Sequence, residues 1–159
     1  MSTVHIEESR IIDARAEDIY AVFADYAGAH NDVLPKEYFK RMAVVEGGHG
    51  AGTIIDVAME IMGKKLDYHM IVTEPEPGRM LAETDEANGV YTMFTIDPVE
   101  GGQRTRVTIA SDMRLSGGLT GMLERMMTPS ITGRIYRQEL EQLAAYMHER
   151  AGRIVYQQA

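Results

Sequence analysis

Residues 119–147 show helical spacing of apolar residues over a length that few small domains contain. Neighbouring apolar residues are mostly three or four positions apart, which places them on one face of a helix. They are Leu119, Met122, Leu123, Met126, Met127, Ile131, Ile135, Leu140, Leu143, Ala144 and Met147. An uninterrupted helix of this span is about 40 Å long, so it needs other elements to cover its apolar face. We expect Pro129 and Gly133 to bend or loosen the helix near its middle.

The residues before this helix predict a run of strands interrupted early by two short helices. The expected strands are 3–12, 39–46, 53–62, 64–74, 79–84, 90–97 and 105–115, and the expected helices are 16–26 and one or two turns within 29–38. Asn88-Gly89 is a strong signal for a tight hairpin. Strands and helices do not alternate as a parallel sheet requires. We therefore predict one α+β domain, residues 1–159, in which an antiparallel sheet curls around the long helix.

Composition excludes several classes of protein. The net charge of −8 is unfavourable for binding nucleic acid, whose phosphates need a basic surface. There are no cysteines, which excludes disulfides and thiolate zinc sites. The start, MSTVHIEESR, lacks the apolar core of a signal peptide, and no apolar run is long enough to span a membrane. The expectation is a soluble cytoplasmic protein without stable membrane insertion, its oligomeric state left open.

Alternation along four of the strands predicts which residues face the helix. The inward sets are Ile55, Val57, Met59 and Ile61; Leu66, Tyr68, Met70 and Val72; Val90, Thr92, Phe94 and Ile96; and Val107, Ile109, Ser111 and Met113. An interior this apolar, with a few hydroxyl groups, is typical of a ligand cavity of at least about 300 Å³. The register of the third strand stays open.

Twelve methionines, against three phenylalanines and no tryptophan, suit either an adaptable cavity or gap-filling in an ordinary core. In the first interpretation, the helix before Pro129 contacts ligand and residues 140–147 pack on the sheet. The predicted ligand contacts are Tyr20, Tyr38, Phe39, Met59, Tyr68, Met70, Thr92, Phe94, Ser111, Met122, Met126 and Met127.

A catalytic interpretation needs an acid or base inside the cavity. The candidates are Glu60, His69 and His30. For Glu60 or His69 to point inward, its strand must take the opposite register, which would expose that strand's apolar residues. A solvent-facing position is the alternative. The five histidines lack metal-site spacing, and no serine-hydrolase motif is present. We expect no metal and no cofactor.

The glycine-rich segment 47–52 lies between two strands. No helix follows it and it lacks the lysine of a phosphate-binding loop, so a hairpin loop is expected rather than a nucleotide site. We expect His49 on this loop to face solvent.

Several segments together resemble the START-like, Bet v 1-like superfamily (SRPBCC), and within it the polyketide cyclase/dehydrase and lipid-transport branch. They are IDARAEDIYAVFADY, EGGHGAGT, VTEPEPGRML, RTRVTI and LEQLAAYM, in order along nearly the whole chain. The resemblance implies a helix-grip fold, in which a seven-stranded antiparallel sheet wraps around the C-terminal helix and encloses an apolar cavity. It also implies that segment 47–52 is a gate at the cavity mouth. It carries no catalytic motif.

Three functions follow as alternatives from the resemblance and the apolar interior. The first is binding of a small hydrophobic molecule such as a polyketide, lipid or aromatic metabolite. The second is a polyketide cyclase or dehydratase that uses an inward-facing Glu or His. The third is a non-catalytic accessory or quinone-binding factor, which an exposed apolar patch would favour.

Overall fold

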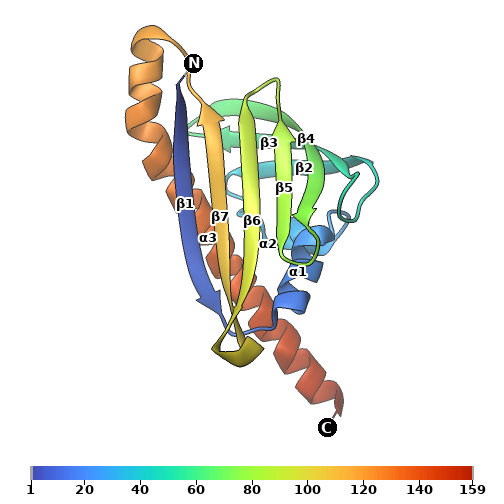
Figure 1. Cartoon of the computed structure of the whole chain (residues 1–159). Helices are drawn as coiled ribbons and strands as arrows, with labels where there is room; N and C mark the ends of the chain where they lie inside the picture. Colours follow the sequence, from blue (N-terminus) through green and yellow to red (C-terminus); the bar gives the residue numbers. More distant parts are fainter. Residues whose placement is uncertain (1, 159) are drawn as a thin grey trace.

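Seven antiparallel strands form one sheet in the order β1-β7-β6-β5-β4-β3-β2 (Figure 1). The computed structural model describes residues 2–158. The strands are β1 (Thr3–Ile12), β2 (Phe39–Glu46), β3 (Ile54–Ile61), β4 (Lys64–Glu76), β5 (Met80–Asp85), β6 (Val90–Val99) and β7 (Arg104–Arg114). From β2 onward each strand pairs with the next, while β1 pairs with β7. The first two strands therefore lie at opposite edges of the sheet.

Two short helices, α1 (Ala16–Ala24) and α2 (Ala29–Val33), connect these opposite edges and lie toward one end of the sheet (Figure 1). Helix α1 buries Ile19, Val22 and Phe23 completely. Its first turn carries Glu17 and Asp18, where acidic side chains interact favourably with the helix dipole. A short 3-10 turn, η1 (Glu100–Gly102), joins β6 to β7.

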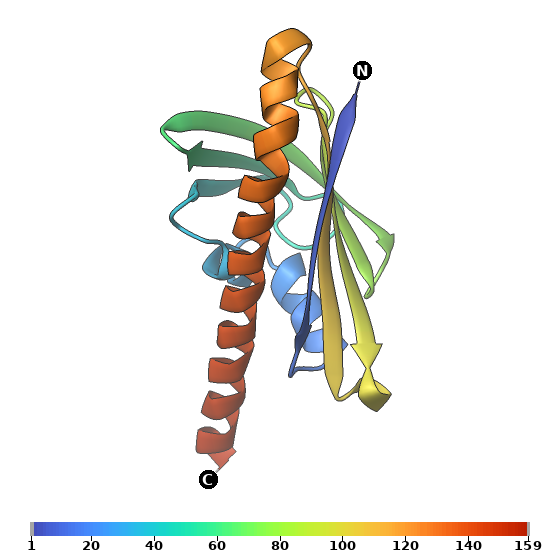
Figure 2. The same cartoon turned by 90° about the vertical axis from the view of Figure 1, so that its left-hand side faces the viewer.

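The C-terminal helix α3 (Gly118–Gln158) is a single helix of 41 residues that continues through Pro129 (Figure 2). A proline removes only one backbone hydrogen bond, and the neighbouring turns keep theirs. The helix runs along the concave side of the sheet and extends past it at the C-terminal end (Figures 1 and 2). Its fully buried apolar residues, including Ile135, Leu140 and Leu143, all follow Pro129.

The strand faces agree with the predicted alternation. Val107 and Ile109 in β7 are fully buried, as is Ile96 in β6. In β3, Ile55 and Val57 are buried and Asp56 is exposed, which settles the register of this strand. The predicted α+β helix-grip fold is therefore confirmed.

Candidate functional site

A cavity of about 90 Å³ lies between the sheet and the middle of α3. Its apolar wall consists of Leu34, Phe39, Met42, Ile55, Val57, Met59, Ile61, Met70, Val90, Phe94, Met113 and Ile135. Its polar lining consists of His30, Tyr68, Glu83, Thr92, Thr132, Tyr136 and Glu139. The cavity is smaller than expected, and four methionine side chains line it, one each from β2, β3, β4 and β7.

Strand β5 places Glu83 inside the cavity. Glu83 pairs with Thr92 and its neighbour Leu81 pairs with Phe94, and both partners on β6 face inward. The Tyr26 hydroxyl donates a hydrogen bond of 2.8 Å to Glu83 Oε1. Burial raises the pKa of Glu83 to about 7, although the hydrogen bond from Tyr26 acts in the opposite direction. The carboxyl group therefore changes charge near neutral pH.

Helix α3 contributes a second buried carboxyl, Glu139, one turn after Ile135 and one turn before Leu143. Only 2% of Glu139 is exposed, and its Oε1 atom has no hydrogen-bond partner among residues 2–158. Burial raises the pKa of Glu139 to about 8, and the negative charge of Glu83 adds to this effect. The two carboxyls therefore sit in one cavity and influence each other's ionisation.

His30, on α2, lies beside Glu83. Its Nδ1–H donates to the Phe23 carbonyl oxygen at 2.6 Å, an assignment that follows because a carbonyl only accepts. Its Nε2 atom is 3.9 Å from Glu83 Oε1, which is too long for a hydrogen bond. Burial lowers the pKa of His30 to about 4, so the ring is neutral at physiological pH.

Three hydroxyl groups form a buried chain next to the carboxyls. Thr92 Oγ1 and Ser111 Oγ are 2.6 Å apart, and Ser111 Oγ also bonds the Tyr136 hydroxyl. Burial raises the pKa of Tyr136, so it stays protonated. Thr92 and Tyr136 line the cavity while Ser111 supports them from behind.

Half of the predicted ligand contacts line the cavity. They are Phe39, Met59, Tyr68, Met70, Thr92 and Phe94. His30, one of the three catalytic candidates, also lines the cavity. Two predicted tyrosines lie elsewhere. The Tyr20 hydroxyl donates to Glu74, and Tyr38 packs against the edge of the core without reaching the cavity.

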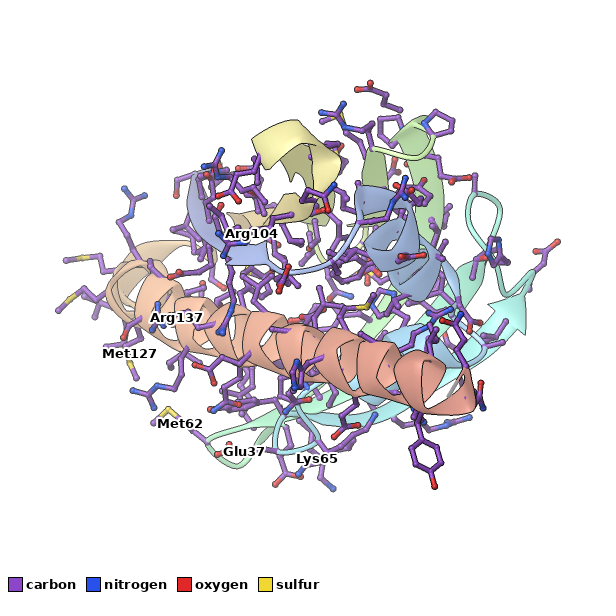
Figure 3. All side chains as sticks on the ribbon, turned by 90° about the horizontal axis from the view of Figure 1, so that it is seen from below. Glu37, Met62, Lys65, Arg104, Met127 and Arg137 are labelled. Carbon is purple, nitrogen blue, oxygen red and sulfur yellow. The ribbon has the colours of Figure 1, made fainter. Side chains whose placement is uncertain are left out.

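Met122, Met126 and Met127 lie away from the cavity, with exposed fractions of 65%, 77% and 39%. The residues of α3 that line the cavity are Thr132, Ile135, Tyr136 and Glu139, all after Pro129. The expected cavity contacts before Pro129 are therefore absent, whereas Leu140, Leu143 and Met147 are buried, as expected. In Figure 3, Met62 and Met127 lie at the periphery of the molecule. The physical reason is that the start of α3 is not covered by the sheet, whatever its apolar pattern.

The other two catalytic candidates do not line the cavity. Glu60 alternates with the inward residues Met59 and Ile61, so it lies on the outer face of β3. The side chain of His69 is 59% exposed, and its Nδ1 lies 2.6 Å from Asp56 Oδ1 on the adjacent strand. Strands β3 and β4 keep the register that buries their apolar residues, so Glu60 and His69 lie on the outer face of the sheet.

Segment 47–52 does not line the cavity, so the gate implied by the resemblance is not seen at this position. Hydrogen bonds hold the segment against α1: Gly50 N donates to Ala24 O at 2.9 Å and Tyr26 N donates to Gly48 O at 3.0 Å. The Ala51 amide donates to Glu74 at 3.0 Å. His49 is exposed, as expected.

Glu83, Glu139 and the Tyr26 hydroxyl are the principal site groups that sequence reasoning missed. Two sequence signals point to the carboxyls. Glu83 is two positions after Leu81 in a strand, and Glu139 occupies the helical face of Ile135 and Leu143. Each breaks an otherwise apolar pattern, and that break is the informative feature.

Within residues 2–158, no group of three or more metal-binding side chains is gathered in one place. In the same range, no helix is both long and apolar enough to cross a membrane.

A sheet that grips a C-terminal helix around an apolar cavity defines the helix-grip class. Residues 3–148 match the model of the family described as polyketide cyclase / dehydrase and lipid transport. The chain belongs to this family, within the START-like, Bet v 1-like superfamily. A sequence search of curated proteins gave no match.

Three solved structures illustrate the likeness in fold. The KanY protein is 23% identical with a TM-score of 0.79, covering 93% of this chain and 99% of KanY. The Zhui aromatase/cyclase from Streptomyces sp. R1128 is 18% identical with a TM-score of 0.75, covering 94% and 96%. Norcoclaurine synthase from Thalictrum flavum, solved with dopamine and hydroxybenzaldehyde, is 16% identical with a TM-score of 0.66, covering 93% and 88%. At these identities the likeness concerns the fold alone.

Proposed function

We propose that this protein binds a small, mostly apolar molecule, such as a polyketide or another aromatic metabolite, in the cavity under α3. The observation that carries the proposal is an apolar cavity with a few polar side chains in its lining. They are His30, Tyr68, Glu83, Thr92, Thr132, Tyr136 and Glu139. An apolar wall supplies affinity through the hydrophobic effect, and a few fixed polar groups orient the guest.

The methionines support a cavity that adapts to its guest. Met42, Met59, Met70 and Met113 line it from four strands. Unbranched thioether side chains change rotamer at low cost and contact aromatic rings favourably. The cavity of about 90 Å³ therefore enlarges when these side chains move aside for a ligand. The family description, which joins cyclases with lipid transport, is consistent with such a ligand.

Replacing Met113 by Trp is expected to weaken ligand binding at least tenfold because the larger ring fills the cavity. To test this, the purified protein is incubated with an organic extract of the cells in which it was expressed. Native mass spectrometry then identifies the molecule that the protein retains. The matched control is Met122→Trp, which places the same ring on the exposed start of α3 and should leave binding unchanged. Circular dichroism checks that both variants fold. Equal retention by Met113→Trp would place the binding site elsewhere.

A second candidate function is catalysis of ring closure and dehydration, favoured by two inward carboxyls that titrate near neutral pH. The Glu83 carboxylate removes a proton from a carbon beside a ketone, and the resulting enolate forms a carbon–carbon bond to a second carbonyl carbon. The Glu139 carboxyl gives its proton to that carbonyl oxygen, which becomes a hydroxyl. Glu139 then removes a second proton from the attacking carbon. The hydroxyl leaves as water with the proton from Glu83, and both carboxyls regain their starting states.

If this chemistry occurs, Glu83→Gln should accumulate an uncyclised precursor, because an amide cannot accept the proton. Mass spectrometry of the bound molecule should then show a species one water heavier than the one bound to wild type. Glu60→Gln, on the outer face of β3, is the matched control and should behave as wild type. Recovery of the same product from Glu83→Gln and wild type would leave binding without catalysis as the function.

The exposed apolar residues at the start of α3 support the third alternative, an accessory or quinone-binding factor. Leu119, Met122, Leu123 and Met126 are each more than half exposed. Such a surface is typical of a site for a protein partner. It gives no indication of that partner's chemistry, whereas the cavity supports the first two functions directly.

A further inference from the structure

The Oε1 atom of Glu139 is a buried acceptor without a donor. It is the only buried side-chain oxygen or nitrogen among residues 2–158 that lacks a hydrogen-bond partner. Leaving such an atom unpaired is unfavourable, and folded proteins satisfy most of these groups. Because Glu139 lines the cavity, a molecule in the cavity can supply the missing donor.

Three hydrogen-bonding groups near the cavity already have other partners. The Tyr26 hydroxyl donates to Glu83, and the Tyr136 hydroxyl bonds Ser111. His30 uses its Nδ1–H on the Phe23 carbonyl. Rotating any of these three groups toward Glu139 would break a buried hydrogen bond, so satisfying Glu139 in this way gives no net hydrogen bond.

Charge around the cavity is also one-sided. Two carboxyls line it, and no Lys or Arg is among the lining residues that the structure describes. An anionic ligand would therefore bury its charge with no compensating cation, and above about pH 8, where Glu83 and Glu139 are ionised, both carboxylates would also repel it. Hydroxyl and amino groups meet no such repulsion and bring the donor that Glu139 lacks.

The walls favour an aromatic framework for this donor. Phe39, Phe94 and Tyr68 present rings, and methionine sulfur atoms prefer positions about 5 Å from aromatic rings. These contacts and the acceptor at Glu139 together fit an aromatic molecule that carries a hydrogen-bond donor.

We propose that the cavity selects aromatic molecules carrying a hydroxyl or amino donor, which bonds Glu139 Oε1, and that it rejects carboxylates. This inference rests on the proposed binding function and adds the substrate class. It places fatty acids and aromatic acids outside the ligand range and phenols and aromatic amines within it.

The test compares naphthalene, 2-naphthol and 2-naphthoate by titration calorimetry with the full chain at about pH 8.5, where most Glu139 is ionised and its oxygens only accept hydrogen bonds. Wild type should bind 2-naphthol about tenfold more tightly than naphthalene, and 2-naphthoate more weakly than naphthalene. In Glu139→Leu the preference for 2-naphthol over naphthalene should disappear. Glu141→Leu, on the exposed face of the same helix, is the matched control and should keep it.

A second variant should increase the affinity for the carboxylate probe instead of abolishing the preference for 2-naphthol. Glu139→Gln removes the charge and adds an amide donor, so 2-naphthoate should bind about tenfold more tightly than to wild type. Tight binding of 2-naphthoate to wild type would overturn the inference, as would an unchanged 2-naphthol preference in Glu139→Leu. If naphthalene binds and the three probes have equal affinity, the proposed selectivity fails and the proposed binding function stands. If no probe binds, the proposed selectivity and the proposed binding function both fail.

Discussion

Replacing Glu139 by Leu is expected to raise the free energy of unfolding by about 2 kcal/mol at pH 8. The carboxyl group is desolvated and one of its oxygens is unpaired, so its removal relieves a cost that the fold now carries. Leu extends the apolar face formed by Ile135 and Leu143. Urea denaturation measures the change. Glu141→Leu, the exposed control, should stay within about 0.5 kcal/mol of wild type.

The effect should depend on pH in a defined direction. The folded-state pKa values of Glu83 and Glu139, about 7 and about 8, lie above the ordinary value of 4.5. The folded protein therefore keeps protons that the unfolded chain has lost. The stability associated with these protons is complete below pH 4.5 and is lost as pH rises through the folded pKa values.

Wild-type stability should consequently fall by about 2–3 kcal/mol between pH 6.5 and 8, and that of Glu139→Leu should fall less. Denaturation at a series of pH values gives the slope. A wild-type stability that stays constant or rises over this pH range would contradict the burial of the two carboxyl groups and their raised pKa values. A Glu139→Leu variant less stable than wild type at pH 8 would mean that Glu139 has a structural partner.

The second large effect is expected at His30, where His30→Ala should lower the free energy of unfolding by about 3 kcal/mol. The ring is buried, with centroids 4.6 Å from Tyr26, 5.4 Å from Phe23 and 5.6 Å from Phe94. Truncation leaves a void among these rings and leaves the Phe23 carbonyl without its side-chain donor. Chemical denaturation measures the loss.

His69→Ala is the matched control for His30→Ala. Its side chain is 59% exposed and its pair with Asp56 lies at the surface, so the change should cost less than about 1 kcal/mol. Equal losses for the two variants would contradict the buried packing of His30.

The pH dependence of His30 runs opposite to that of the carboxyls. Its folded pKa, about 4, lies below the ordinary value of 6.5, so the unfolded chain binds a proton that the folded state excludes. Its contribution to stability is complete above pH 6.5 and is lost as pH falls toward 4. In His30→Ala, this loss of stability between pH 6.5 and 4 should be absent.

An unpaired carboxyl that lowers stability is the kind of feature that functional sites retain. Glu139 could be replaced by an apolar residue that suits its position in the fold, because its Oε1 atom has no hydrogen-bond partner among residues 2–158. Its presence in the cavity is consistent with the proposed ligand.

Much of the fold follows from local patterns in the sequence. Alternation in β4, β6 and β7 identified their inward faces because each strand has one apolar side and one solvated side. The same logic applied to β5 would have placed Glu83 beside Leu81. The helical period likewise identified Ile135, Leu140 and Leu143 as buried, and Glu139 lies on their face.

The candidate site was less predictable because it depends on which apolar surface finds a partner. Met122, Met126 and Met127 have the same helical spacing as the buried half of α3, yet the sheet does not cover them. A periodic pattern shows that a face is apolar, and only the relative lengths and positions of sheet and helix decide whether it is buried.

By itself, the sequence determined the order of the elements, the antiparallel α+β class and the inward faces of most strands, since these depend on neighbours within a few residues. The tertiary structure alone decided that Glu83, Glu139 and His30 meet in one cavity and that the Tyr26 hydroxyl bonds Glu83. They come from β5, α3, α2 and the segment after α1, and only the curl of the sheet around the helix brings them together. Their altered pKa values have the same origin, because burial is a property of the assembled fold and not of any one segment.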